Sequence, residues 1–198
     1  MTGTISQLPL LSYEHHVLPG GRLPLRIVEP RHIRMVKESY QREHAFALCM
    51  HSEEDETIYP IVTLVKIIDF EPLAHNMLGV IVEGINSLVV DEVTKDDEGL
   101  EIGECQRLDL WEPIPLHAKY ADLAEMYQQF LSDNPKLEEL YPEPDLSNAS
   151  WVAQRWLELL PIPAKEKQMV MGNECPEYCL EILSQLNLTL ENGMKEIS

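Results

Sequence analysis

Two small groups of histidine and cysteine side chains are the first places to look for chemistry in this sequence. His15 and His16 are adjacent, and adjacent residues of a strand point to opposite faces, which suits a two-ligand site poorly. We therefore expect one ring to be half-buried and the other exposed. Cys49 and His51 share one strand face by parity and could form a ligand set with Glu53. We favour a solvated acidic loop at residues 52–56 over that metal site.

The cysteines are Cys49, Cys105, Cys175 and Cys179. Cys175 and Cys179 lie four positions apart, on one face of an expected helix, but structural zinc takes about four ligands and no second cluster completes a set. The sequence has no basic segment followed by an apolar segment at its start, as a secretion signal would. We therefore predict free thiols in a cytoplasmic protein, with the cysteines as small buried side chains and no metal bound.

Gly20-Gly21-Arg22 is similar in composition to a loop that binds phosphate. A phosphate site needs glycine N–H groups at the start of a helix, whereas a strand pattern follows these residues. The motifs GxxxxGK[ST], GxGxxG, GxSxG and HExxH do not occur. Spacing alone leaves a serine–lysine dyad open, but no serine lies in a motif that supports one. We predict a turn here, no nucleotide or other cofactor, and no enzymatic activity.

Charge is distributed unevenly along the 198 residues, whose net charge is -19. Residues 1–51 hold six Lys/Arg and four Asp/Glu, and residues 52–198 hold nine and thirty. Phosphate backbones repel such an acidic chain, so a main role in binding nucleic acid is disfavoured. No apolar run approaches the roughly 18 residues of a membrane helix, so we expect no membrane partner.

The apolar pattern changes near residue 113, and we predict an α+β protein with domains at 1–112 and 113–198. Leu23, Leu25 and Ile27 alternate with polar residues, as in a half-buried strand, and Pro24 favours an edge position or a bulge. A helix is expected over 30–43, and a turn at 95–99 between two strands. Further strands are expected at 8–11, 45–50, 58–70, 77–83, 88–93 and 100–110.

Apolar residues at helical spacing predict a bundle in the second half of the chain. The expected helices cover 117–131, 134–140, 148–160, 163–172 and 176–188, and residues 189–198 are expected to fray. Trp151 and Trp156 share one side of the third of these helices. We favour a role in the bundle core over a groove for an unfolded peptide, because large aromatic rings suit a core.

Several short motifs occur in an order that is typical of one protein family. They are "LPLL", "VLPGGRLPLRIVEPRHIRMV", "TLVKIIDFEPL", "LGVIVEGINSLVV" and "LELLPIPAKEKQMVMGNECPEYCLEILSQL". Together they resemble the N-terminal domain of Lon proteases from about Leu8 to Leu188. The signature positions are Pro19, Gly20, Glu29, Pro30, Arg31, Glu83 and Gly84. Val62, Ser87 and the two histidines 15 and 16 depart from the family pattern, which leaves the expected fold intact.

The resemblance implies a PUA-like, twisted and barrel-like β domain followed by a helical bundle. It also implies a non-catalytic module, here expected in a stand-alone form without the ATPase and peptidase modules of Lon. Its expected partner is an unfolded polypeptide or a partner protein, in connection with ATP-dependent proteolysis, bound in apolar grooves between the two domains. A small-molecule or regulatory site in the β domain is the alternative, and the oligomeric state stays open. The candidate binding residues are Tyr13, His15, His16, Trp151 and Trp156.

Overall fold

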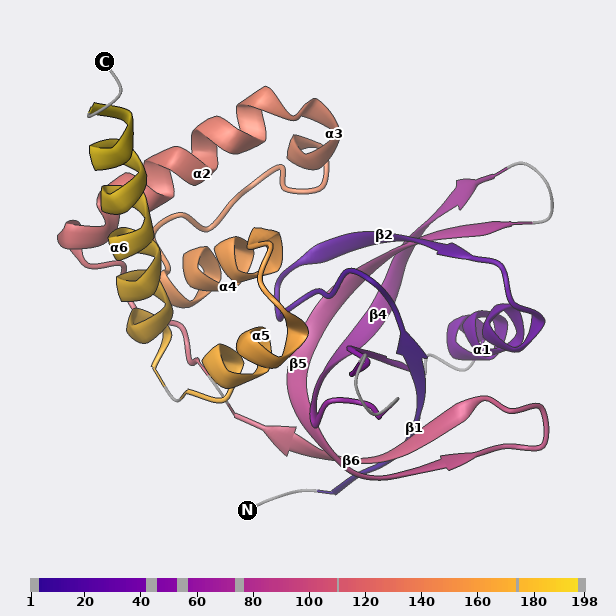
Figure 1. Ribbon diagram of the computed structural model, residues 1–198. Helices are drawn as coiled ribbons and strands as arrows, with labels where there is room; N and C mark the ends of the chain where they lie inside the picture. The colour runs from indigo at the N-terminus through magenta and orange to yellow at the C-terminus, as the bar shows by residue number, and fades with distance from the viewer. Residues whose placement is uncertain are drawn as a thin grey trace. The chain divides into compact units, whose positions relative to one another are not determined.

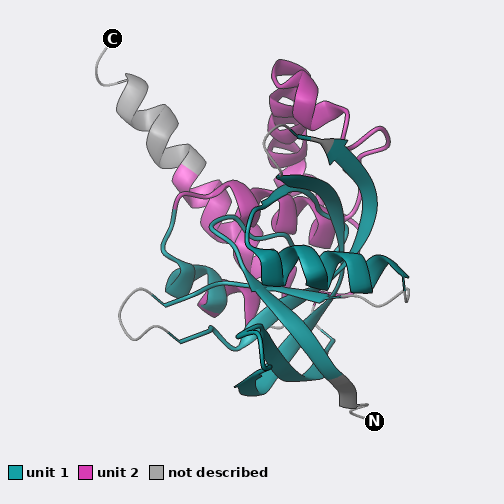
Figure 2. Ribbon diagram, turned by 90° about the vertical axis from the view of Figure 1, so that its right-hand side faces the viewer, with its two compact units in different colours: residues 1–109, 162–168 teal, residues 110–161, 169–198 magenta. Residues whose placement is uncertain are grey.

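The computed structural model describes residues 4–41, 46–52, 57–73, 77–109, 111–173 and 175–195. They form two compact units (Figure 2). The first unit combines Met1–Asp109 with Ile162–Gln168, and the second combines Leu110–Pro161 with Met169–Ser198. The sequence had assigned all of 113–198 to the second domain. The segment 162–168 groups with the first unit instead, where Gln168 accepts from the Ile61 N–H at 2.9 Å and donates to the Ile61 carbonyl at 2.7 Å.

The first unit is built on one six-stranded sheet (Figure 1). Its strands are β1 (Thr4–Ser12), β2 (Arg22–Ile27), β3 (Phe46–Cys49), β4 (Ile61–Pro72), β5 (Leu78–Lys95) and β6 (Glu101–Leu108). Their order is β2-β5-β4-β3-β1-β6, and β5 also pairs with β6. This last pairing closes five strands into a ring and leaves β2 at an edge. The fold is therefore α+β with a barrel-like sheet, as expected.

Strand β5 is longer than the sequence suggested. The two strands expected at 77–83 and 88–93 are a single element, because residues from Leu78 to Val89 pair with β4 along one strand, with a register shift between Gly84 and Asn86. Its later residues, from Ser87 onward, pair with β6. The expected turn at 95–99 joins these two strands, and Gly99 adopts a left-handed φ of 77° there. One strand thus belongs to two parts of the sheet, which a local sequence pattern does not reveal.

The outer edge of β2 is closed to further strands. Leu25 and Ile27 are buried while Pro24 and Arg26 are exposed, which confirms the predicted alternation. The Arg26 N–H points away from β5 and donates to the Tyr13 hydroxyl at 3.3 Å. Pro24, two residues earlier on the same edge, has no N–H to offer. Edge strands are often protected in this way against pairing with another chain.

Helix α1 (Pro30–Gln41) packs against this sheet and is attached to the β5–β6 turn. Met35 and Val36 are buried in the core shared by the sheet and the helix. Arg34 forms ion pairs with Asp96 and with Glu98, the latter at 3.1 Å. The helix was expected to reach residue 43, but residues 42–45 lie outside the described part. The ion pairs and the apolar face together hold α1 in one place on the sheet.

The second unit is helical. Its elements are a 3₁₀ turn η1 (Ala118–Tyr120) and helices α2 (Ala121–Asp133), α3 (Pro135–Glu138), α4 (Ala149–Leu159) and α6 (Pro176–Lys195), together with the end of α5 (Ala164–Met171). Asn148 caps α4 by accepting the N–H groups of Ser150 and Trp151. Helix α6 extends to Lys195, beyond the end expected at residue 188, and the fraying of residues 189–198 stays a prediction. Among the described helices, none is both long and apolar enough to cross a membrane.

Candidate functional site: a pocket at the ends of two parallel strands

The ends of β1 and β3 lie side by side because the two strands are parallel. Leu10 pairs with Ala47 and Ser12 with Cys49. The chain therefore leaves both strands at the same end, and the Tyr13 N–H still donates to the Cys49 carbonyl at 3.3 Å. Residues that follow parallel strands commonly surround ligand sites, since their backbone groups are no longer used by the sheet.

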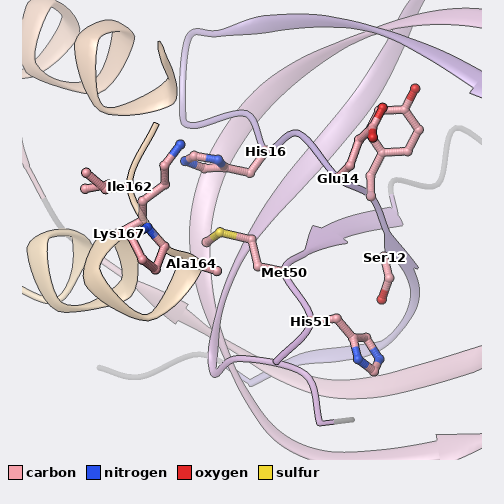
Figure 3. A pocket seen from close by; sticks show the side chains of 10 residues that line it. Ser12, Glu14, His16, Met50, His51, Ile162, Ala164 and Lys167 are labelled. Atoms are coloured by element: carbon pink, nitrogen blue, oxygen red, sulfur yellow. The ribbon is translucent and has the colours of Figure 1, made fainter. Parts of the chain in front are cut away.

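A pocket of about 520 Å³ opens at these strand ends (Figure 3). It is lined by Ser12, Tyr13, Glu14, His16, Met50, His51, Ile162, Pro163, Ala164 and Lys167. In the view of Figure 3, His16, Met50 and Lys167 gather at one side, and Ser12 and His51 at the other. All of these residues belong to the first unit. Sequence reasoning could not find the pocket, because residues 162–167 are more than a hundred positions from its other walls.

Two of the five candidate binding residues, Tyr13 and His16, line this pocket, and His15 does not. His15 is exposed and His16 is half-buried, as predicted, but the reason differs from the one expected. Strand β1 ends at Ser12, so the two histidines lie in an irregular segment and not on a strand. The His15 Nδ1 atom is 3.4 Å from a carboxylate oxygen of Glu14.

Cys49 is a buried thiol that does not line this pocket. Burial raises the pKa of its thiol to about 12, and the contact between Ser12 Oγ and Cys49 Sγ at 3.3 Å opposes that rise only in part. The side chain packs in an apolar cluster with Leu10 and Val62, while His51 is exposed. Glu53, the third member of the set considered from the sequence, lies outside the described residues. In the part of the chain that the structure describes, no group of three or more His, Cys, Asp or Glu side chains could hold a metal ion.

The signature around Gly20 is a structural lock between the loop that precedes β2 and strand β5. Gly20 adopts φ 74°, and its N–H donates to the Gly84 carbonyl at 2.9 Å. The Gly84 N–H donates to the Gly21 carbonyl at 2.9 Å, and Pro19 bridges to Gly84. A Cβ on Gly84 would lie 2.2 Å from the Leu18 carbonyl oxygen. Glycine is needed at 84 for this close approach, not for a left-handed bend.

Glu83, next to Gly84, joins two basic residues on neighbouring strands. Its carboxylate lies 3.0 Å from Arg22 Nε and 2.8 Å from Lys66 Nζ. Partial burial by itself would raise the pKa of Glu83. The hydrogen bonds and charges of Lys66 and Arg22 outweigh this and hold the pKa below its ordinary value. The carboxylate thus joins β2 and β4 to β5.

The Glu29-Pro30-Arg31 signature begins α1 and connects it to the sheet. The Ile33 N–H donates to the Glu29 carbonyl at 2.9 Å, the first bond of the helix. Arg31 forms an ion pair with Glu29 at 2.7 Å and donates to the Gly99 carbonyl at 2.9 Å. These residues therefore position α1 against the β5–β6 turn.

Trp151 and Trp156 lie in the second unit, packed around one tyrosine. Both rings meet Tyr127 edge-on, with ring centroids 5.5 and 5.6 Å apart. The Trp156 indole N–H donates to the Leu123 carbonyl at 2.9 Å. The structure accounts for both rings by packing within the helical unit, and their role in a peptide groove stays a prediction.

One exposed aromatic pair was missed by sequence reasoning. Tyr40 on α1 and Phe70 on β4 meet edge-on with centroids 5.0 Å apart. Their exposed fractions are 64% and 40%, high values for aromatic side chains. Tyr40 lies one residue before the end of α1, and periodicity within the helix does not show whether its ring is covered by the sheet. The thirty positions between the two residues conceal their contact in the sequence.

A model of the substrate-binding domain of ATP-dependent protease La (LON) matches residues 7–186. The chain belongs to this LON substrate-binding domain family. Among solved structures, it is similar to a Lon N-terminal domain protein from Xanthomonas campestris, with a TM-score of 0.73 and 25% identity over 91% of this chain and 98% of that one. It is also similar to the N-terminal domain of a Mycobacterium avium complex Lon protease, with a TM-score of 0.62 and 14% identity over 90% and 96% of the two chains. No curated protein matches.

The LON family model covers every signature position from Pro19 to Gly84. The structural roles of these residues explain why that part of the sequence carries the resemblance. It contains the lock at Gly84, the tie at Glu83 and the start of α1. Each requires particular residue types at fixed positions of the LON domain fold. None of these signature residues lines the pocket that contains Tyr13 and His16.

Proposed function

We propose that this LON domain binds exposed apolar segments of unfolded substrate proteins, without catalysing a reaction on them, in support of ATP-dependent proteolysis. The family supplies the general role of substrate binding. The observation that carries the specific proposal is the exposed pair Tyr40 and Phe70. A cytoplasmic location, expected from the sequence, is part of the same proposal.

The pair offers apolar surface at low entropic cost. Tyr40 lies on a helix that ion pairs hold on the sheet, and Phe70 lies on a strand paired with β5. Because each ring is already held by its neighbour, little side-chain freedom remains to be lost on binding. Removing apolar surface from water contributes roughly 25 cal/mol per Å², so covering two partly exposed rings contributes a few kcal/mol.

An unfolded segment is the occupant that suits this surface. A folded partner needs a large complementary face, commonly about 800 Å² on each side. Two aromatic rings, with the exposed Lys37 one helical turn before Tyr40, provide a small apolar contact beside a group that can donate to a backbone carbonyl. Such a contact accepts many sequences and binds each weakly, as recognition of varied unfolded proteins requires.

Fluorescence anisotropy of labelled casein, an unfolded protein, tests the proposal. We expect saturable binding by the unaltered chain, and about tenfold weaker binding after Tyr40→Ser or Phe70→Ser, the loss typical of an aromatic contact residue. Tyr40→Phe retains the ring and should bind casein as the unaltered chain does.

Val93→Ser is the matched control, because Val93 has the same exposed fraction as Phe70, 40%, and lies on a strand of the same unit. Circular dichroism establishes that each variant is folded. Casein binding that is unchanged in a folded Tyr40→Ser/Phe70→Ser double variant, or equally reduced by Val93→Ser, would contradict the proposal.

A further inference from the structure

A second pocket continues the one at the strand ends. Its volume is about 470 Å³, and Glu29, Arg31, His32, Lys95, Gly99 and Glu101 line it together with Ser12 and His51. Ser12 and His51 line the first pocket as well. The two pockets therefore meet at these residues, and we call them together the strand-end site. Each is within the range of roughly 300–1,000 Å³ that is usual for small-ligand sites.

The second pocket has charges of both signs in equal number. Arg31 lies 2.7 Å from a Glu29 carboxylate oxygen, and Lys95 Nζ lies 3.8 Å from Glu101. Burial lowers the pKa of His32 below its ordinary value, with Glu29 opposing, so this imidazole is neutral at pH 7. Two cations and two carboxylates thus line one small volume, and their formal charges sum to zero.

The first pocket has a different lining. Tyr13 and Met50 directly follow strands β1 and β3, Ile162 and Pro163 precede α5, and Ala164 is the first residue of α5. These five side chains give one side of the strand-end site an apolar wall. Glu14, His16 and Lys167 line the same pocket. A ligand that filled both pockets would meet this apolar wall beside a few polar groups at one end, and the paired charges of the second pocket at the other.

We propose that the strand-end site binds a small zwitterion with an apolar side chain, either a free apolar amino acid or a short peptide with both ends free. The apolar side chain fits the first pocket. The ammonium group lies toward Glu29 and Glu101, and the carboxylate toward Arg31 and Lys95. A phosphate or a nucleotide fits poorly, because it brings only negative charge to a wall that already holds two carboxylates, in a chain of net charge -19.

This site goes beyond the binding of unfolded segments at Tyr40 and Phe70, since it shares no lining residue with that pair. A ligand here would signal the presence of amino acids or of peptides, the products of proteolysis. The two occupants share one chemistry and differ in length, so the test treats them as separate arms.

Thermal unfolding with added ligand is the test, because a ligand specific to the folded state raises Tm. The probes are L-phenylalanine, the tripeptide Ala-Phe-Ala with free ends, the same tripeptide acetylated and amidated at its ends, and sodium phosphate. We expect L-phenylalanine or free Ala-Phe-Ala to raise Tm by about 3–5 °C at ten times its Kd. The probe that raises Tm more shows whether the site prefers a free amino acid or a short peptide. The blocked tripeptide and phosphate should leave Tm unchanged.

His51→Ala, at the junction of the two pockets, should abolish the rise in Tm. His15→Ala is the matched control, since His15 is exposed and lines neither pocket. Ala164→Phe, which fills the first pocket from α5, is a second variant that should also abolish the rise. The proposal is overturned if neither free-ended probe raises Tm, if phosphate or the blocked tripeptide does so equally, or if the rise persists in a folded His51→Ala. Casein binding by His51→Ala should be unchanged, so failure here and failure of the proposed function remain distinguishable.

Discussion

Replacing Gly84 by alanine tests whether the resemblance signature acts as a structural lock. The new Cβ would lie 2.2 Å from the Leu18 carbonyl oxygen and 2.8 Å from the Leu18 carbonyl carbon. Both are backbone atoms, so neither can rotate away as a side chain could. Gly84 has no left-handed φ, so alanine is compatible with its backbone conformation and the cost arises from the contact alone.

The expected loss in the free energy of unfolding follows from the contacts that Gly84→Ala must change. Forcing an extra methyl group into a packed position costs roughly 1–3 kcal/mol. Moving Leu18 away also weakens the two hydrogen bonds at Gly84, from the Gly20 N–H and to the Gly21 carbonyl, at about 1 kcal/mol each. Alanine also reduces the conformational entropy of the unfolded chain, which stabilises the folded protein by about 0.4–1 kcal/mol. We expect a net loss of about 3 kcal/mol in the free energy of unfolding.

Urea denaturation followed by far-UV circular dichroism measures this loss, and a thermal scan should show Tm lower by about 6–12 °C. The three tryptophans, at positions 111, 151 and 156, all belong to the second unit. Their fluorescence therefore reports on the helical unit alone. A fluorescence midpoint that stays in place while the dichroism midpoint falls would show that the two units unfold separately.

Gly103→Ala is the matched control. There the nearest atoms to a new Cβ are side-chain carbons of Leu10, at 2.9 and 3.1 Å, and a side chain adjusts more cheaply than a backbone. We expect a smaller loss than for Gly84→Ala. A loss below about 0.5 kcal/mol for Gly84→Ala, or a loss no larger than that of Gly103→Ala, would refute the reasoning.

Three further predictions concern individual side chains. In the folded protein at pH 8, a thiol reagent should label the partly exposed Cys175 quickly and Cys49 very slowly, since burial raises the pKa of Cys49 to about 12; equal rates measured by mass spectrometry would contradict this. Glu83→Gln should cost about 1 kcal/mol at pH 7. The pKa of Glu83 is lowered in the folded protein, so its contribution to the free energy of unfolding is complete above the unfolded pKa and is lost as pH falls through the folded pKa. In urea denaturation, the difference in the free energy of unfolding between the variant and the unaltered chain should therefore shrink below about pH 4. Tyr13→Phe removes the acceptor of the Arg26 N–H and should lower the free energy of unfolding by about 0.5–1 kcal/mol. A change outside that range in urea denaturation would show that the hydrogen bond to Arg26 is not the main role of the Tyr13 hydroxyl.

Local patterns in the sequence were sufficient to predict most of the strands and helices. The alternation at Leu23–Ile27 predicted β2, and Pro24 correctly indicated an edge, because the missing N–H of proline is a local property. Glu29-Pro30 marked the start of α1 for the same reason. The pattern did not show that β5 is one continuous strand, since its pairing with both β4 and β6 depends on distant residues.

The candidate site was less predictable than the elements. Tyr13 and His16 were named from the sequence and do line the first pocket, but other walls come from Met50 and His51, which follow β3, and from residues 162–167. Trp151 and Trp156 were named with them and belong to the other unit, where packing explains their positions.

The sequence by itself determined the family, the strand and helix types, and the lack of known nucleotide or protease motifs, because each of these depends on residue types at short spacing. Only the tertiary structure decided where a ligand could bind. The strand-end site exists because β1 and β3 are parallel and end together, and the exposed pair of Tyr40 and Phe70 exists because a residue near the end of α1 contacts one near the end of β4. Both depend on contacts between residues thirty or more positions apart, and a local pattern carries no information about such contacts.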